Sequence, residues 1–159
     1  NLKNKCWIKI NKFDYRNGKE LIEDLNKNKI ICSLWIEKII GKRKFNNNYT
    51  FPILLIKINL KKDLGIKKPT ELSKIYKLIK KKYLLVPPEI AIFSRLKYKN
   101  QKSGEWIRFA TPLKSMVDKD KIPHLPKIGK GLGRLFVETY WSYPKAIFHP
   151  HNDFIVLKK

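Results

Sequence analysis

Acidic residues are scarce in this sequence, in which 13 Asp and Glu stand against 36 Lys and Arg among 159 residues. Cysteine is scarcer still, and its two thiols, Cys6 and Cys32, lack a C-x-x-C partner. No apolar run approaches the roughly 20 residues that a membrane-spanning helix needs. The longest run, 51–58, is interrupted by Pro52 and Lys57. The sequence therefore predicts neither a zinc ribbon nor a membrane-spanning helix.

Positive charge is abundant instead. The formal net charge is +23, and a free domain repels itself at that density. A polyanion relieves the repulsion, because each lysine or arginine that neutralises a phosphate releases counterions. With 43% hydrophobic residues, the chain is too apolar for a disordered basic tail. We therefore predict a folded RNA-binding protein, with an anionic membrane surface as the alternative polyanion.

Lysine dominates the cations, and the arginines are Arg16, Arg43, Arg95, Arg108 and Arg134. Arginine is the better fork for phosphate, so an AT-rich genome explains the bias better than binding chemistry does. The chain begins at Asn1 and its sole methionine is Met116, which is compatible with a removed targeting peptide. We predict a mitochondrial location, with another organelle or the cytoplasm as alternatives.

The pattern of apolar residues predicts an α+β fold, with helices in the first half and the middle and an antiparallel, hairpin-rich second half. Residues 1–60 are expected to form an α/β extension, and residues 61–159 a basic RNA-binding domain. Within the extension we expect strands over Cys6–Phe13 and Thr50–Leu60 and helices over Lys19–Asn26 and Ile30–Ile40.

Helices are predicted in the middle of the chain. Thr70 is expected to cap the first of them, whose apolar stripe is Leu72, Ile75, Tyr76 and Ile79. Lysines including Lys77 and Lys81 lie off this stripe, where they face either solvent or RNA phosphates. Pro87-Pro88 ends this helix, and a second helix over Glu89–Tyr98 carries Arg95 and Lys97.

The second half is expected to consist mostly of strands. A strand over Glu105–Ala110 places Trp106 and Arg108 on one face. A long basic loop, including Lys114, is expected from Thr111 to Gly133. A hairpin should follow, with strands over Leu135–Ser142 and Ala146–His149 joined by a turn at Tyr143-Pro144-Lys145.

The end of the long loop, Lys127–Arg134, carries glycines at alternate positions. Glycine removes side-chain bulk, so backbone amides in such a loop approach phosphates closely. The segment is not a nucleotide-binding P-loop, because no Ser or Thr follows Lys130. The plainer alternative is a flexible hairpin connection.

Several short segments occur in a familiar order: Trp106-Ile-Arg-Phe109, Pro112, Lys127-Ile-Gly-Lys-Gly-Leu-Gly133, and Tyr143-Pro144-Lys145 followed by Ala146-Ile-Phe148. Over residues 88–150 this order resembles the large-subunit ribosomal protein L sixteen family of bacteria and organelles. That family carries W-I-R-x-F-P, a basic loop ending in R-M-G-K-G-K-G, and a hairpin. Lys127 and Leu132 depart from it, standing where the family has arginine and lysine.

The resemblance implies a structural constituent of the ribosome that binds large-subunit rRNA near the tRNA-binding side. Neighbouring ribosomal proteins and tRNA are its further expected partners, and neither enzymatic activity nor a cofactor is expected. The residues expected to bind RNA are Lys77, Lys81, Arg95, Lys97, Arg108, Lys114, Lys127, Gly129, Lys130, Gly131, Gly133, Arg134 and Lys145.

Two other functions stay open. The chain is alternatively another ribosomal or ribonucleoprotein component of either subunit. It is less well described as a metal-dependent nuclease in which His149 and His151 bind a metal with Asp153 or His124. Aromatic residues near the expected hairpin turn, Tyr140, Trp141 and Tyr143, are candidates for stacking on unpaired bases.

Overall fold

The α+β prediction is confirmed by a computed structural model, which describes residues 6–159. The helices are α1 (Gly18–Lys27), α2 (Leu34–Ile40), α3 (Leu60–Leu64), α4 (Leu72–Lys82) and α5 (Pro88–Lys97). The strands are β1 (Cys6–Ile10), β2 (Ile31–Cys32), β3 (Ile53–Asn59), β4 (Thr70–Glu71), β5 (Tyr83–Leu84), β6 (Trp106–Phe109), β7 (His124–Gly131), β8 (Arg134–Trp141), β9 (Ile147–Phe148) and β10 (Asp153–Lys158).

One mixed sheet organises the fold, with strand order β1-β3-β10-β6-β7-β8-β2 and with β5 paired to β10. The pairs β10–β6 and β8–β2 are parallel, and the other neighbours are antiparallel. A separate pair joins β4 to β9. The last strand of the chain, β10, therefore lies inside the sheet between β3 and β6, while β1 forms one edge.

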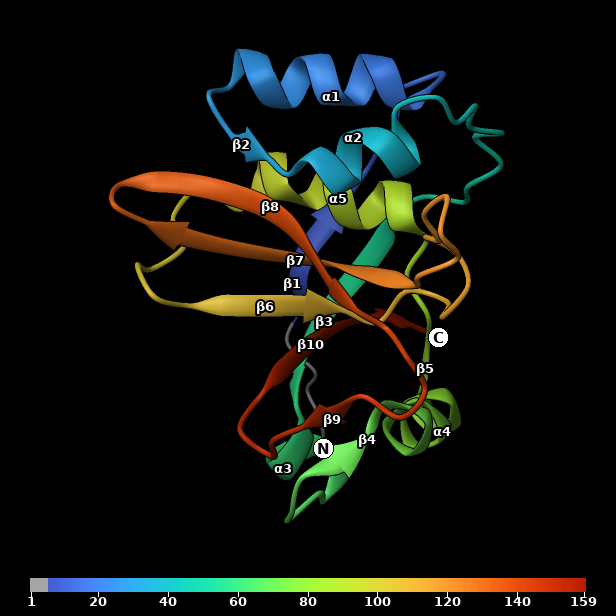
Figure 1. Ribbon diagram of the computed structural model, residues 1–159, viewed down its shortest axis with the longest axis vertical. Helices are drawn as coiled ribbons and strands as arrows, with labels where there is room; N and C mark the ends of the chain where they lie inside the picture. Colours follow the sequence, from blue (N-terminus) through green and yellow to red (C-terminus); the bar gives the residue numbers. More distant parts are fainter. Residues whose placement is uncertain (1–5) are drawn as a thin grey trace.

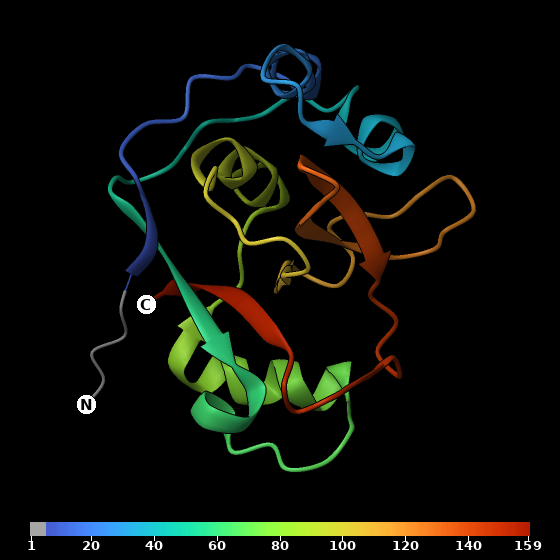
Figure 2. The ribbon, with the colours of Figure 1, turned by 90° about the vertical axis from the view of Figure 1, so that its left-hand side faces the viewer.

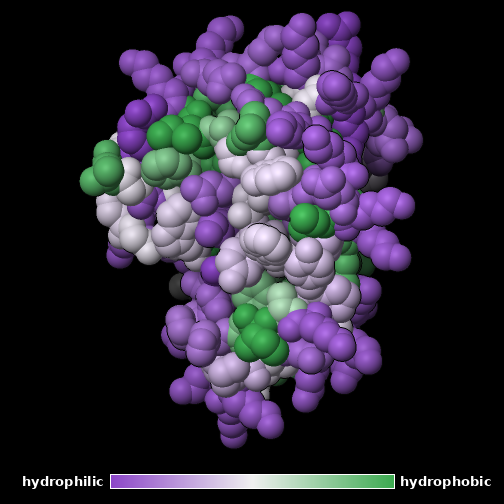
Figure 3. Space-filling view, viewed as in Figure 1, coloured by the Kyte–Doolittle hydropathy of each residue, from purple (hydrophilic) through white to green (hydrophobic). Residues whose placement is uncertain are grey.

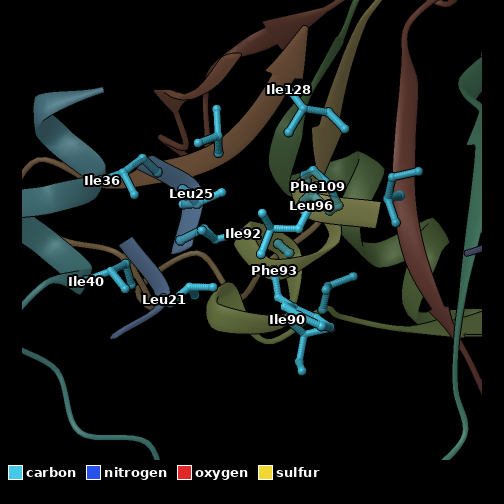
Figure 4. Packing of buried hydrophobic residues seen from close by; sticks show 14 of the residues in the cluster. Leu21, Leu25, Ile36, Ile40, Ile90, Ile92, Phe93, Leu96, Phe109 and Ile128 are labelled. Atoms are coloured by element: carbon cyan, nitrogen blue, oxygen red, sulfur yellow. The ribbon is translucent and has the colours of Figure 1, made fainter. Parts of the chain in front are cut away.

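Helices pack on the two faces of the sheet. In Figures 1 and 2, α1, α2 and α5 lie at one end of the molecule, and α3 and α4 lie at the other. Alternate residues of β10 serve different cores, since Ile155 packs with the first helix group while Phe154 and Val156 pack with the second. Figure 4 shows the first core, which includes Leu25 and Ile36 of the helices and Ile128 of the sheet.

The helices form where the local sequence favours them. The Asn17 side chain accepts a hydrogen bond from the Glu20 amide at 3.0 Å and caps α1. The predicted stripe of α4, Leu72 to Ile79, is buried as expected. The predicted cap at Thr70 is wrong, because Thr70 lies in β4 and Glu71 precedes the helix without a side-chain cap.

The second half needs two corrections. The predicted loop over 111–133 ends at Pro123, because residues from His124 onward form β7. The predicted hairpin across Tyr143–Lys145 is wrong, since β9 pairs with β4 and not with β8. The true hairpin joins β7 to β8 through Leu132 and Gly133.

The predicted boundary near residue 60 does not separate two cores. Strands β1 and β3 belong to the same sheet as β6–β8, and Leu21 packs in one cluster with Ile90 and Ile128. Residues 1–5 of the predicted extension lie outside the described part. Between residues 6 and 159, no helix has the length and apolarity that crossing a membrane requires.

Candidate nucleic-acid interface

The β7–β8 hairpin is the best-formed part of the predicted RNA-binding segment. Its eight residue pairs run from His124↔Trp141 to Gly131↔Arg134. The glycine-rich segment is thus mostly a strand, and only Leu132 and Gly133 form the turn. Both turn residues have positive φ, 50° and 74°, as in a two-residue turn that matches the twist of the strands.

One face of the hairpin is covered by helices, and we call it the covered face. Ile107, Ile128 and Val137 point from β6, β7 and β8 into the first core and are fully buried. Burial of such aliphatic side chains contributes about 1.5–3 kcal/mol each. The covered face therefore holds the hairpin against α5 and α2.

Arg95 reaches from α5 to the edge of this covered face. Its Nη1 donates to Gln101 Oε1 at 2.5 Å and to the carbonyls of Gly129 and Phe136 at 3.2 Å, and its Nη2 donates to the Tyr98 carbonyl. The residue is fully buried, and desolvation lowers its pKa to about 10, so it stays charged at neutral pH.

The prediction that Arg95 binds RNA is corrected by this burial. Every acceptor that it meets belongs to the folded chain, and its guanidinium is closed off from solvent. Arg95 ties α5 to β7 and β8 and is a structural residue.

The opposite face of the hairpin, with its neighbour β6, carries Trp106, Arg108, Lys127, Phe136, Glu138 and Tyr140, and we call it the open face. Trp106 is 36% exposed. Its ring lies on Gly129, where a Cβ atom would come within 2.3 Å of the ring. The prediction that Gly129 admits a phosphate is therefore corrected, because the absent side chain makes room for Trp106.

Rings and cations alternate along the open face. Lys127 Nζ lies 4.8 Å from the centroid of Trp106 and 5.3 Å from that of Tyr140, and the Arg108 guanidinium lies 4.8 Å from the Tyr140 centroid. The Trp106 and Phe136 centroids are 6.4 Å apart. Such contacts hold cations beside ring faces.

The cations of the open face are only partly neutralised. Glu138 approaches Lys127 at 3.8 Å, and Arg108 donates to the neutral Asn152 Oδ1 at 3.0 Å. Burial is the main cause that lowers the pKa of both Lys127 and Arg108; the Glu138 carboxylate raises that of Lys127. An incoming phosphate would therefore relieve an unfavourable charge environment.

Most of the other predicted RNA-binding cations lie at the surface. Six of these cations are exposed: Lys77, Lys81, Lys97, Lys114, Arg134 and Lys145. Lys130 is half-buried. Gly133 is exposed and Gly131 half-buried. Within residues 6–159, salt bridges join Lys12–Asp14, Arg16–Glu20, Lys57–Glu105, Lys127–Glu138 and His124–Asp118. Most surface lysines in this described part of the chain thus have no acidic partner.

A buried polar corner that the sequence did not predict joins Asp118, His124 and Thr139. His124 Nε2 lies 3.0 Å from Asp118 Oδ2, and His124 Nδ1 lies 2.9 Å from Thr139 Oγ1. The Trp35 ring is 5.2 Å from the imidazole. The hydrogen bond with His124 is the first cause that lowers the pKa of Asp118. This corner fixes the loop before β7 to the sheet.

The residues considered for a metal site are dispersed. His149 and His151 stack with ring centroids 5.6 Å apart at the surface, and Asp153 Oδ1 accepts from the Asn59 side chain at 2.9 Å. His124 is occupied by Asp118. No group of three or more His, Cys, Asp or Glu side chains from residues 6–159 is placed to hold a metal ion.

The predicted stacking residues divide. Tyr140 packs against Phe148, with ring centroids 5.6 Å apart, while Trp141 and Tyr143 are 53% and 39% exposed. Phe136 was not predicted as a stacking residue. It follows Arg134 by two positions on β8, so both side chains lie on the same face of this strand.

Comparison with protein-family models, with curated protein sequences and with solved structures found no match to this chain.

Proposed function

We propose that this chain binds RNA and serves as a structural component of a ribonucleoprotein. The observation that carries the proposal is the open face, where Trp106 and Phe136 stand beside incompletely neutralised cations. Aromatic rings accept unpaired bases, with a gain of about 1–3 kcal/mol per base, and cations accept phosphates. One surface therefore offers both kinds of contact.

The two kinds of contact have different roles. Exposed cations at the hairpin end, such as Arg134, and on α4, such as Lys77 and Lys81, contact phosphates and position the RNA without reading its sequence. The rings of the open face contact bases that are not already stacked in a helix. Because paired bases in RNA helices are inaccessible to side chains, single-stranded loops and bulges suit this face best.

A finer proposal places the chain in the large subunit of a mitochondrial ribosome, near the tRNA-binding side. Its support is the order of segments between Trp106 and Gly133, together with the net charge of +23. The part of the resemblance that needs a hairpin at Tyr143–Lys145 gives no support, because β9 pairs with β4. Co-sedimentation with separated ribosomal subunits at moderate and then high salt tests it. Travel with the small subunit, or with neither subunit, would contradict this placement but leave RNA binding intact.

The broader proposal is tested by binding to a labelled RNA hairpin over a range of salt concentrations. We expect affinity to fall steeply as salt rises, because several phosphates are neutralised together. Anionic lipid vesicles serve as the competing polyanion. Failure to bind RNA at low salt, or stronger binding to the vesicles, would defeat the proposal.

Two charge-matched double variants locate the RNA. Lys130→Ala with Arg134→Ala and Lys77→Ala with Lys81→Ala each remove two cations, so the net charge changes equally. We expect the hairpin pair to lose about tenfold in affinity and the α4 pair about twofold. Equal losses would show attraction to net charge alone and would remove the special role of the hairpin.

A further inference from the structure

Leu132, at the tip of the β7–β8 hairpin, is 99% exposed. The next most exposed large hydrophobic residue among those described is Leu34, at 59%. In Figure 3 a hydrophobic group marks the left edge of the molecule, where Figure 1 places the tip of this hairpin. The leucine gains no burial within the chain.

The backbone makes this leucine more unusual. Its φ of 50° lies in the left-handed region, which costs about 1–2 kcal/mol for a residue with a Cβ atom. Glycine or asparagine is the ordinary choice at such a turn position. A strained and wholly exposed leucine has no structural compensation here, and strain of this kind is a sign of function.

The hairpin holds its tip firmly. Pairing continues without a bulge as far as Gly131↔Arg134, Arg95 binds the carbonyls of Gly129 and Phe136, and Trp106 lies on Gly129. A rigid support lets an apolar side chain enter a narrow space without a large loss of conformational entropy.

The charged residues nearest to the leucine along the two strands are cations. Lys130 and Arg134 flank the turn on its two strands. The segment with Lys102 lies alongside, because the Gly104 amide donates to the Lys130 carbonyl at 3.0 Å. An apolar side chain with cations on both sides fits an apolar slot framed by negative charge. An opened base step, with base faces inside and phosphates outside, has this chemistry.

We propose that Leu132 acts as a wedge that enters an RNA helix at a bulge, where one base step is already opened. The inference rests on the proposed RNA binding and adds the substrate class. A bulge is favoured over an acidic protein pocket because the open face lies directly behind the tip. There, Phe136 and Trp106 are placed to stack on the displaced base.

Two synthetic RNA hairpins test the wedge, one fully paired and one with a single-nucleotide bulge flanked by 2-aminopurine. We expect the native chain to prefer the bulged RNA by about tenfold and to raise the 2-aminopurine fluorescence. Leu132→Gly should bind both RNAs equally and keep the native affinity for the paired one. Its thermal midpoint should not fall, because glycine adopts positive φ freely.

Leu34→Ala is the matched control, since it removes an exposed leucine from α2, away from the tip. It should keep the full preference for the bulge. Retention of the preference by Leu132→Gly, or its absence from the native chain, would overturn the wedge while paired-RNA binding continues. If the native chain binds neither RNA, the proposed function itself is defeated.

Discussion

The two faces of the β7–β8 hairpin are made from alternate residues of the same strands, yet they differ in every physical respect. Ile128 and Val137 on the covered face are fully buried against helices. Lys127 and Glu138, one position away on each strand, lie on the open face and retain contact with solvent. Buried apolar side chains are concentrated on one face, and rings and partly neutralised cations on the other.

The same difference separates two arginines. Arg95 is fully enclosed by neutral acceptors of its own chain, whereas Arg108 stacks on Tyr140 at the partly exposed open face. Both count equally toward the net charge of +23. Net charge therefore overstates the number of cations that solvent or a ligand can reach, and position in the fold decides which of them are accessible.

Replacing Arg95 with methionine should have the largest effect on folding. Methionine keeps the length of the side chain but leaves the carbonyls of Gly129, Phe136 and Tyr98 without their donor. We expect a loss of about 4 kcal/mol in the free energy of unfolding, measured by urea denaturation. A loss below about 1 kcal/mol would mean that the hydrogen bonds of Arg95 do not hold α5 against β7 and β8.

Neighbouring alanine substitutions compare the two faces directly. Ile128→Ala should cost about 3 kcal/mol of stability because it leaves a cavity in the first core. Lys127→Ala should cost less than about 1 kcal/mol, since its ion pair with Glu138 is partly solvated, but should weaken RNA binding. Urea denaturation and RNA titration of both variants check this. The distinction between the two faces fails if both variants lose the same stability and the same RNA affinity.

Gly129→Ala should have an intermediate effect, about 2 kcal/mol, because the new methyl group meets the Trp106 ring. Displacement of the ring should change the tryptophan fluorescence. The double variant with Trp106→Ala should recover part of the stability, since the clash is gone. If the double variant is as unstable as the sum of the two single ones, the glycine is required for another reason.

Acid should loosen the corner formed by Asp118 and His124, the smallest of the four effects. The pKa of Asp118 is lowered in the folded chain, so its contribution to stability is present above its unfolded pKa and is lost as pH falls through the folded one. Urea midpoints of native chain and Asp118→Asn should therefore converge between neutral and acidic pH. A constant difference would show that the carboxylate does not titrate with folding.

Much of the fold was accessible from periodicity. The stripe from Leu72 to Ile79 predicted α4, and the helix predicted over Glu89–Tyr98 corresponds to α5, because both depend on contacts within about one helical turn. The pairing of β9 with β4 was not accessible, since residues 147 and 71 are joined only by tertiary packing. The proline turn at Tyr143–Lys145 wrongly suggested that β9 pairs with β8, its neighbour in the sequence.

The candidate site was predicted in part. Trp106 and Arg108 were correctly placed on one strand face, because alternation is a local property. Arg95 was misassigned, since an arginine on a helix shows no sign of its burial until the hairpin folds over it. The contact between Asp118 and His124 was not predicted, because a loop and a strand bring the two residues together.

Composition and local pattern were enough to predict an α+β chain with a large excess of positive charge, because charge and periodicity are carried by single residues and their near neighbours. Only the folded sheet decided that Gly129 makes room for a ring, that Arg95 is enclosed and that Leu132 stands alone at a tip. Burial depends on what packs from elsewhere in the chain, and that information is absent from any local stretch of sequence.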